Sequence, residues 1–127
     1  MSYFDSPSPT GLYAFQLHRY YATHQRLCFR MQHVEPAEDI HLCYLYFSMT
    51  LHFSGSPWWV GKEFYTGSKN DLLSYCDKYE SLKAVRIVYE DMEEDSLRFY
   101  KLYVFPHKTD VFYVVAGGCN ITETEPQ

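Results

Sequence analysis

Residues 40–53, which read IHLCYLYFSMTLHF, decide the fold of this 127-residue chain. The stretch contains no charged residue, no proline and no glycine. One row of alternate side chains is apolar from Cys43 to Phe53. The other row runs from Ile40 and Leu42 through Tyr44 and Tyr46, and it ends with hydroxyl and imidazole groups. Because side chains along a strand point to opposite faces in turn, the pattern predicts a long central strand with one buried and one partly covered face.

The same alternation predicts the neighbouring strands. Residues 12–26 fit the strand and helix templates about equally, and we prefer a strand that runs into a turn near Ala22. Further strands are predicted over residues 27–34, 58–66, 85–90, 97–105 and 111–116.

One helix, about residues 69–83, stands out from the strands. Ser68 and Asp71 approximate a capping box, in which each side chain satisfies a backbone amide of the first turn. Apolar residues then recur at helical spacing and predict a stripe that faces the core. The stripe consists of Leu72, Tyr75, Cys76, Tyr79 and Leu82.

The order of these elements predicts an α+β fold. Short connections favour antiparallel neighbours, so we expect a strongly twisted, mainly antiparallel sheet of about six to seven strands, or a half-barrel, with the helix on one face. Residues 12–118 should form a single domain. Residues 1–11, with two Ser-Pro pairs, read as a flexible lead-in, and residues 119–127 as a frayed tail.

Composition narrows the classes of function. The formal charge is −5, with 16 acidic and 11 basic residues, so the sequence lacks the basic footprint of a dedicated nucleic-acid-binding domain. No signal peptide or membrane-length apolar stretch is visible, and the four cysteines are far apart. We therefore expect a cytoplasmic protein with reduced thiols, with neither nucleic acid nor a membrane as its main partner.

Motifs for chemistry are weak. His33, His41 and Cys43 could converge if their strands pair, but Cys43 lies in the apolar row, where free cysteine behaves as a small hydrophobic residue. The sequence contains no nucleophile elbow and no glycine-rich phosphate loop. We therefore predict no metal, no cofactor and no catalytic residue.

A histidine-containing strand followed by a helix with Tyr75 and Lys78 resembles the order in rolling-circle replication initiators. The resemblance implies a nucleophilic tyrosine beside a metal held by two strand histidines. Cys43 stands where that family has a second histidine or a glutamine, and the chain lacks the positive charge for single-stranded DNA. We interpret Tyr75 as a core residue of its helix.

Two features suggest contact with another protein. Trp58 and Trp59 are adjacent, so one should be buried and the other should lie in solvent or on the second face with the tyrosines, where it could anchor a partner. Residues 90–95 form an acidic run, predicted as a hairpin tip that either docks on a basic partner or is simply solvated. The candidate partner-binding residues are Tyr44, Tyr46, Trp58, Trp59, Glu90, Asp91, Glu93, Glu94 and Asp95.

Two functions follow from these features. The preferred one is a small acidic intracellular module that binds another protein, as an inhibitor, antagonist, immunity-type factor or adaptor, or that pairs as a homodimer. The alternative is a small-molecule-binding protein or cofactor-free enzyme with a pocket between a curved sheet and the helix. Its lining would be Tyr44, Tyr46, His52, Trp58, Tyr75 and Tyr79.

Overall fold

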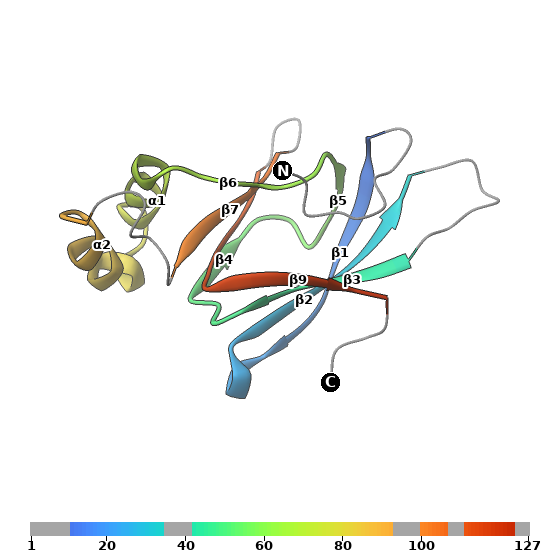
Figure 1. Ribbon diagram of the computed structural model, residues 1–127, viewed down its shortest axis with the longest axis horizontal. Helices are drawn as coiled ribbons and strands as arrows, with labels where there is room; N and C mark the ends of the chain where they lie inside the picture. Colours follow the sequence, from blue (N-terminus) through green and yellow to red (C-terminus); the bar gives the residue numbers. More distant parts are fainter. Residues whose placement is uncertain (1–10, 35–41, 93–99, 107–110, 124–127) are drawn as a thin grey trace.

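The computed structural model describes residues 11–34, 42–92, 100–106 and 111–123. These residues form two antiparallel sheets and two short helices, stacked as three layers (Figure 1). The α+β class and the antiparallel pairing agree with the sequence pattern, whereas the division into two sheets and the second helix do not.

A five-stranded sheet forms the first layer, in the order β5-β1-β2-β3-β9. Its strands are β1 (Tyr13–Tyr21), β2 (Arg26–His33), β3 (Leu42–Ser48), β5 (Trp58–Gly61) and β9 (Gly118–Thr122). A short 3-10 turn, Ala22–His24, joins β1 to β2, so the ambiguous residues 12–26 form the predicted strand and turn.

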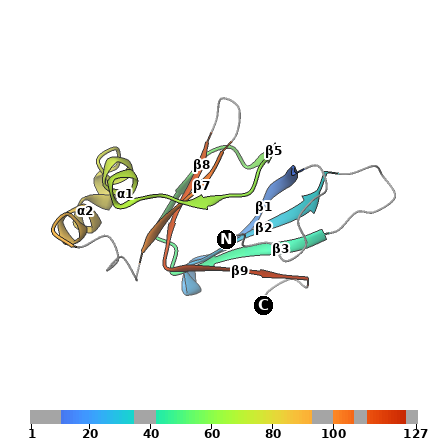
Figure 2. The same ribbon diagram turned by 45° about the horizontal axis from the view of Figure 1, so that its top comes forward.

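A four-stranded sheet forms the middle layer, in the order β4-β8-β7-β6. Its strands are β4 (His52–Ser54), β6 (Tyr65–Thr66), β7 (Lys101–Phe105) and β8 (Phe112–Ala116). Helices α1 (Lys69–Cys76) and α2 (Lys83–Tyr89), with the 3-10 turn Glu80–Leu82 between them, cover the side of this sheet that faces away from the first (Figures 1 and 2). Within the described ranges, no helix combines the length and apolarity needed to cross a bilayer.

A bent two-stranded ribbon joins the sheets, because β3 leads directly into β4 and β8 leads directly into β9. Met49 adopts a left-handed backbone (φ 53°) at the bend, and Thr50 is buried with its hydroxyl donating to the Phe47 carbonyl. The Gly117 amide donates to the Ser48 carbonyl at 3.0 Å, which keeps the ribbon paired through the corner. The single strand predicted over residues 40–53 is therefore divided at the bend into β3 and β4.

The main core lies between the two sheets and is built from stacked rings. The alternate row Cys43, Leu45 and Phe47 is fully directed into it, as the sequence pattern predicts. Phe105, from β7, lies at its centre with no exposed surface. Ring centroids between 4.9 and 6.1 Å from that of Phe105 belong to Phe15, Phe29, Phe47, Trp59, Phe64 and Phe112.

A second core lies between the four-stranded sheet and the helices. Ser68 caps α1 as predicted: its hydroxyl accepts from the Asp71 amide at 3.2 Å, and its own amide donates to the Asp71 carboxylate at 2.9 Å. Leu72 and Cys76 of the predicted stripe are buried against the sheet. The predicted helix nevertheless ends at Cys76, so it is shorter than residues 69–83.

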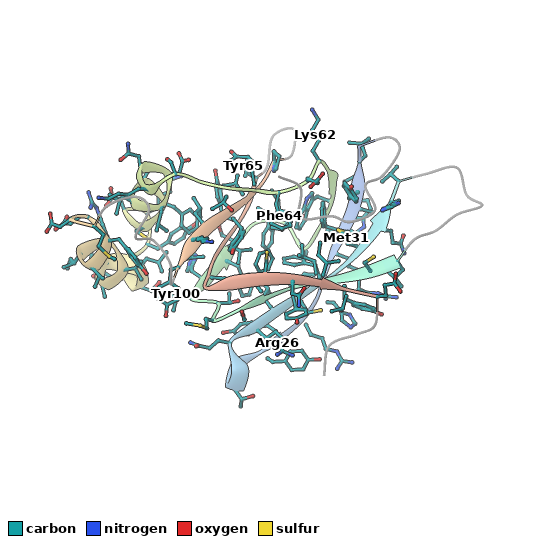
Figure 3. All side chains as sticks on the ribbon, viewed as in Figure 1. Arg26, Met31, Lys62, Phe64, Tyr65 and Tyr100 are labelled. Atoms are coloured by element: carbon teal, nitrogen blue, oxygen red, sulfur yellow. The ribbon has the colours of Figure 1, made fainter. Side chains whose placement is uncertain are left out.

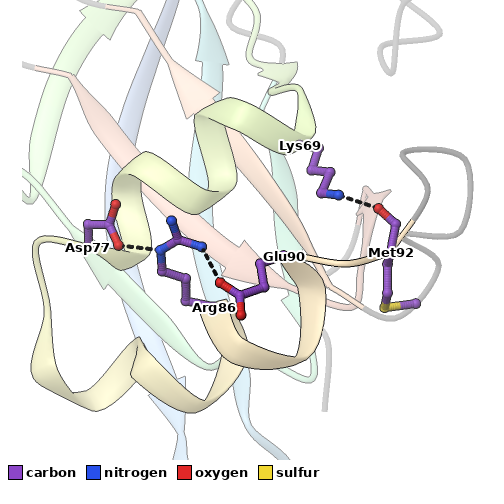
Figure 4. A network of polar contacts seen from close by, with 5 residues as sticks. All are labelled: Lys69, Asp77, Arg86, Glu90 and Met92. Carbon is purple, nitrogen blue, oxygen red and sulfur yellow. Dashed lines mark hydrogen bonds and ion pairs between the residues drawn. The ribbon is translucent and has the colours of Figure 1, made fainter.

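The strand predicted at residues 85–90 is wrong, because Val85–Tyr89 lie in α2. Their β-branched residues favour a strand locally, but tertiary packing overrides that preference. Tyr89 is buried in the second core, and Arg86 forms ion pairs with Asp77 at 2.5 Å and with Glu90, one turn on, at 3.2 Å (Figure 4). Lys69 also donates to the Met92 carbonyl and ties the end of this segment to α1.

The prediction of a frayed tail from residue 119 also differs from the structure. Residues 118–122 form β9, which pairs with β3 from Ser48 to Tyr44. The polar appearance of Asn120 and Thr122 is that of a strand with one exposed face, and the alternate residues Cys119 and Ile121 pack against the main core.

Candidate functional site

The five-stranded sheet has an outer face, on the side away from the four-stranded sheet. Residues paired directly across antiparallel strands point to the same face, so the register defines the rows of this face. The outer face consists of Ala14, Gln16, His18, Arg19, Tyr21, Arg26, Cys28, Arg30, Gln32, Leu42, Tyr44, Tyr46, Trp58, Val60, Asn120 and Thr122. Both helices lie on the far side of the other sheet, so they do not cover it (Figures 1 and 2).

One row of the outer face crosses all five strands. Trp58 pairs with Gln16, Gln16 with Arg30, and Arg30 with Tyr44, which is followed by Thr122. Trp58 is 61% exposed at the end of this row. Its neighbour Trp59 is 3% exposed in the main core, so the prediction that the two tryptophans separate is confirmed.

Neighbouring side chains hold the tyrosine rings of the outer face in place. The guanidinium carbon of Arg26 lies 4.9 Å from the centroid of the Tyr46 ring, a cation–π distance. Asn120 donates to the Tyr46 hydroxyl at 3.0 Å, and the ring of His18 lies 5.9 Å from that of Tyr44. Arg26 projects away from the sandwich, whereas Phe64 lies between the sheets (Figure 3). The tyrosines are half-buried by these neighbours rather than free to rotate.

Both edges of the five-stranded sheet carry side chains that bond to their own backbone. On β9, the side-chain oxygen of Asn120, Oδ1, accepts a hydrogen bond from the Ile121 backbone amide at 2.9 Å. On β5, the Ser56 hydroxyl donates to the Trp58 carbonyl at 3.1 Å. Each bond occupies one backbone group that an added strand could otherwise use.

A polar cluster lies between β4 and α1. The Tyr75 hydroxyl lies 2.8 Å from His52 Nδ1 and 2.6 Å from the Ser54 hydroxyl. Burial raises the pKa of Tyr75 well above its usual value and lowers the pKa of His52, so both groups are neutral at pH 7. Nδ1 of a neutral His52 can accept a hydrogen bond from the Tyr75 hydroxyl, while the Ser54 hydroxyl donates to the phenol oxygen. The cluster joins strand to helix, and a buried neutral phenol is unsuited to act as a nucleophile.

The pocket expected between sheet and helix is not formed by the residues assigned to it. His52, Tyr75 and Tyr79 gather under the helices, whereas the other three assigned residues lie on the outer face. A hollow of about 170 Å³ lies beside Tyr75, and another of about 120 Å³ lies near Lys69. Pockets for drug-sized ligands have roughly 300–1,000 Å³, so neither hollow suits such a ligand.

The residues considered for a metal lie apart. The His33 ring packs edge-on against Tyr13, with centroids 5.4 Å apart, and Cys43 is buried in the main core. His41 lies outside the described residues. Within the part of the chain that the structure describes, no three histidine, cysteine or carboxylate groups gather as a metal site would require.

Glu90 and Asp91 lie at the opposite end of the molecule from the outer face. Glu90 and Asp91 follow the last turn of α2, and Glu90 pairs with Arg86, so the acidic run does not begin on a hairpin as predicted. Glu93, Glu94 and Asp95 lie outside the described residues. Sequence reasoning missed the arginines and Asn120, because their place beside the tyrosines depends on strand order.

The His52 cluster makes stability depend on pH. Its folded-state pKa is lowered, so the unfolded chain binds a proton first, and the free energy of unfolding should fall as the pH drops from 6.5 through the folded pKa. Urea unfolding between pH 7.5 and 5 should show a smaller pH dependence in His52→Gln than in wild type. His18→Gln, on the outer face, is the matched control for the loss of an imidazole elsewhere in the fold. Equal slopes in all three proteins would contradict the assignment.

Comparisons with protein-family models, with curated proteins and with solved structures give no match for this chain.

Proposed function

We propose that this chain is a non-enzymatic module that binds another protein through the outer face of its five-stranded sheet. The row that ends at Trp58 carries this proposal. Tryptophan, tyrosine and arginine are the residues that dominate binding energy in protein interfaces, and Trp58, Tyr44 and Arg30 occur together in this row. Because Trp58 is largely exposed, its ring contributes little to the protein's own core. Contact with a partner would bury this ring.

The size of the outer face suits a reversible complex. Five strands at about 4.8 Å spacing and six residues at about 3.3 Å give a projected area on the order of 500 Å². Side-chain relief raises the accessible area toward the roughly 800 Å² per partner of a standard interface. Obligate assemblies bury far more, so an inhibitor, adaptor or immunity-type factor fits better than a permanent subunit.

The proposal includes a cytoplasmic location for the protein. All four cysteines are free thiols, and Cys28, Cys43 and Cys76 are buried. A reducing compartment keeps such thiols unpaired. The alternative of a small-molecule binder has weaker support, since the hollow beside Tyr75 holds little more than a few water molecules.

A Trp58→Ala variant tests the proposal. Because Trp58 is 61% exposed, its removal should leave the unfolding transition almost unchanged. In affinity capture from lysate of cells that express the chain, the Trp58→Ala variant should retain about tenfold less of a partner than wild type does, as expected for a hot-spot residue.

Tyr65→Ala is the matched control. Tyr65 is 51% exposed but belongs to β6 of the other sheet, so its replacement should leave capture intact. A partner that is lost equally with both variants, or with neither, would contradict binding through the outer face.

A further inference from the structure

The charge of the outer face is opposite to that of the whole chain. The formal net charge is −5, yet none of the described residues that make up this face is acidic. It carries three arginines on two adjacent strands: Arg19, which donates to the Tyr21 hydroxyl at 3.2 Å, Arg26, which stacks on Tyr46, and Arg30. The face therefore combines fixed positive charge with tyrosine and tryptophan rings, and this combination bears on the chemistry of its partner.

We infer that the outer face binds an acidic segment of a partner protein, with a carboxylate at Arg30 and an apolar side chain against Trp58. This inference rests on the proposed function and reverses the charge expected of the partner from the acidic run at 90–95. Charge complementarity carries it, because opposite potentials steer encounter and exclude partners of the wrong sign.

The guanidinium group of an arginine such as Arg30 suits a carboxylate in particular. A guanidinium group presents its N–H donors as a planar fork that matches the two oxygens of a carboxylate. Arg26 is stacked on Tyr46, which Asn120 in turn holds by a hydrogen bond, so part of its side chain is ordered before binding. Arg30 lies between Gln16 and Tyr44 in the register, where the aromatic neighbour can exclude water from an ion pair.

Two other occupants fit less well. A second copy docking face to face would place like-charged arginines opposite one another, which is unfavourable. A nucleic acid could stack its bases on sheet aromatics, but a polyanion gains its affinity from many phosphate contacts and would approach a chain of net charge −5. A short acidic peptide meets the arginines with less repulsion from the rest of the molecule.

The test is a titration of the ¹⁵N-labelled full chain, observed by NMR at low ionic strength. The probes are a capped glutamate decapeptide, a capped lysine decapeptide and a ten-residue oligothymidylate. The glutamate peptide should shift amide signals of β2 and β3 on the outer face, including that of Arg30, and added salt should weaken the effect. Arg30→Glu should weaken this binding at least tenfold, and Arg30→Gln should weaken it less.

Lys62→Glu is the matched control, because it changes the net charge equally at an exposed residue after β5 (Figure 3). It should change the affinity less than twofold. Tighter binding of the lysine peptide or of the oligothymidylate, shifts confined to the helices, or equal weakening by Lys62→Glu would overturn the inference. If these results appear while capture still depends on Trp58, the partner is not acidic but the proposed function stands.

Discussion

Replacement of Phe105 by alanine is expected to lower the free energy of unfolding by about 3–5 kcal/mol, the usual cost of removing a buried phenyl ring. Phe105 has no exposed surface, and rings from both sheets surround it. Side chains from both sheets meet in this core, so the Phe105 ring helps to hold the two layers together by packing. The cavity that alanine leaves would be lined by rigid aromatic side chains that cannot easily collapse.

Urea unfolding followed by circular dichroism measures this loss. Domains of this size are stable by about 5–15 kcal/mol, so Phe105→Leu should accompany the alanine variant in case the latter is largely unfolded. Phe53→Ala is the control, because Phe53 is only half-buried at the margin of the same core. A loss for Phe105→Ala no larger than for Phe53→Ala would contradict a core centred on Phe105.

Replacement of Gly55 by alanine should destabilise the protein by about 2–6 kcal/mol, from backbone strain and overpacking together. Gly55 has a φ of 137°, which residues with a side chain rarely adopt. An added Cβ would lie 2.5 Å from Phe112 Cδ2 and 2.9 Å from the Phe112 Cα atom. The second contact is with backbone, so β8 would have to move away from the turn after β4.

A Gly11→Ala variant separates the cost of backbone strain from the cost of overpacking. Gly11 also has a positive φ, 74°, but an added Cβ would have nothing within 4 Å. Its replacement should cost only about 1–2 kcal/mol of backbone strain. Thermal unfolding of the two variants should therefore show a clearly lower midpoint for Gly55→Ala. Equal midpoints would mean that Phe112 does not pack against this turn.

Local patterns predicted the fold where one face of an element is buried and the other is not. The alternation of Cys43, Leu45 and Phe47 identified β3, and the capping box at Ser68 identified the start of α1. Patterns failed where packing overrode local preference. Val85, Ile87 and Val88 suggest a strand by their local preference. In the folded protein, the burial of Tyr89 and the ion pairs of Arg86 favour a helix instead.

The candidate site was predicted in part for the same reason. Alternation alone is enough to separate Trp58 from Trp59, and to place Tyr44 and Tyr46 on one face. The order of the strands is not encoded in the spacing of any one of them. Only the pairing of β2 with β1 and β3 brings Arg30 between the tryptophan and the tyrosines, so the positive charge of the face could not be foreseen.

Site-specific photo-crosslinking tests the central claim, that the outer face is the docking surface, most directly. A benzoylphenylalanine residue at position 58 should form a discrete crosslink to one partner in cells that express the chain. The same residue at position 87, 68% exposed on α2 at the opposite end of the molecule, should not. A crosslink from position 87 with none from position 58 would contradict the claim.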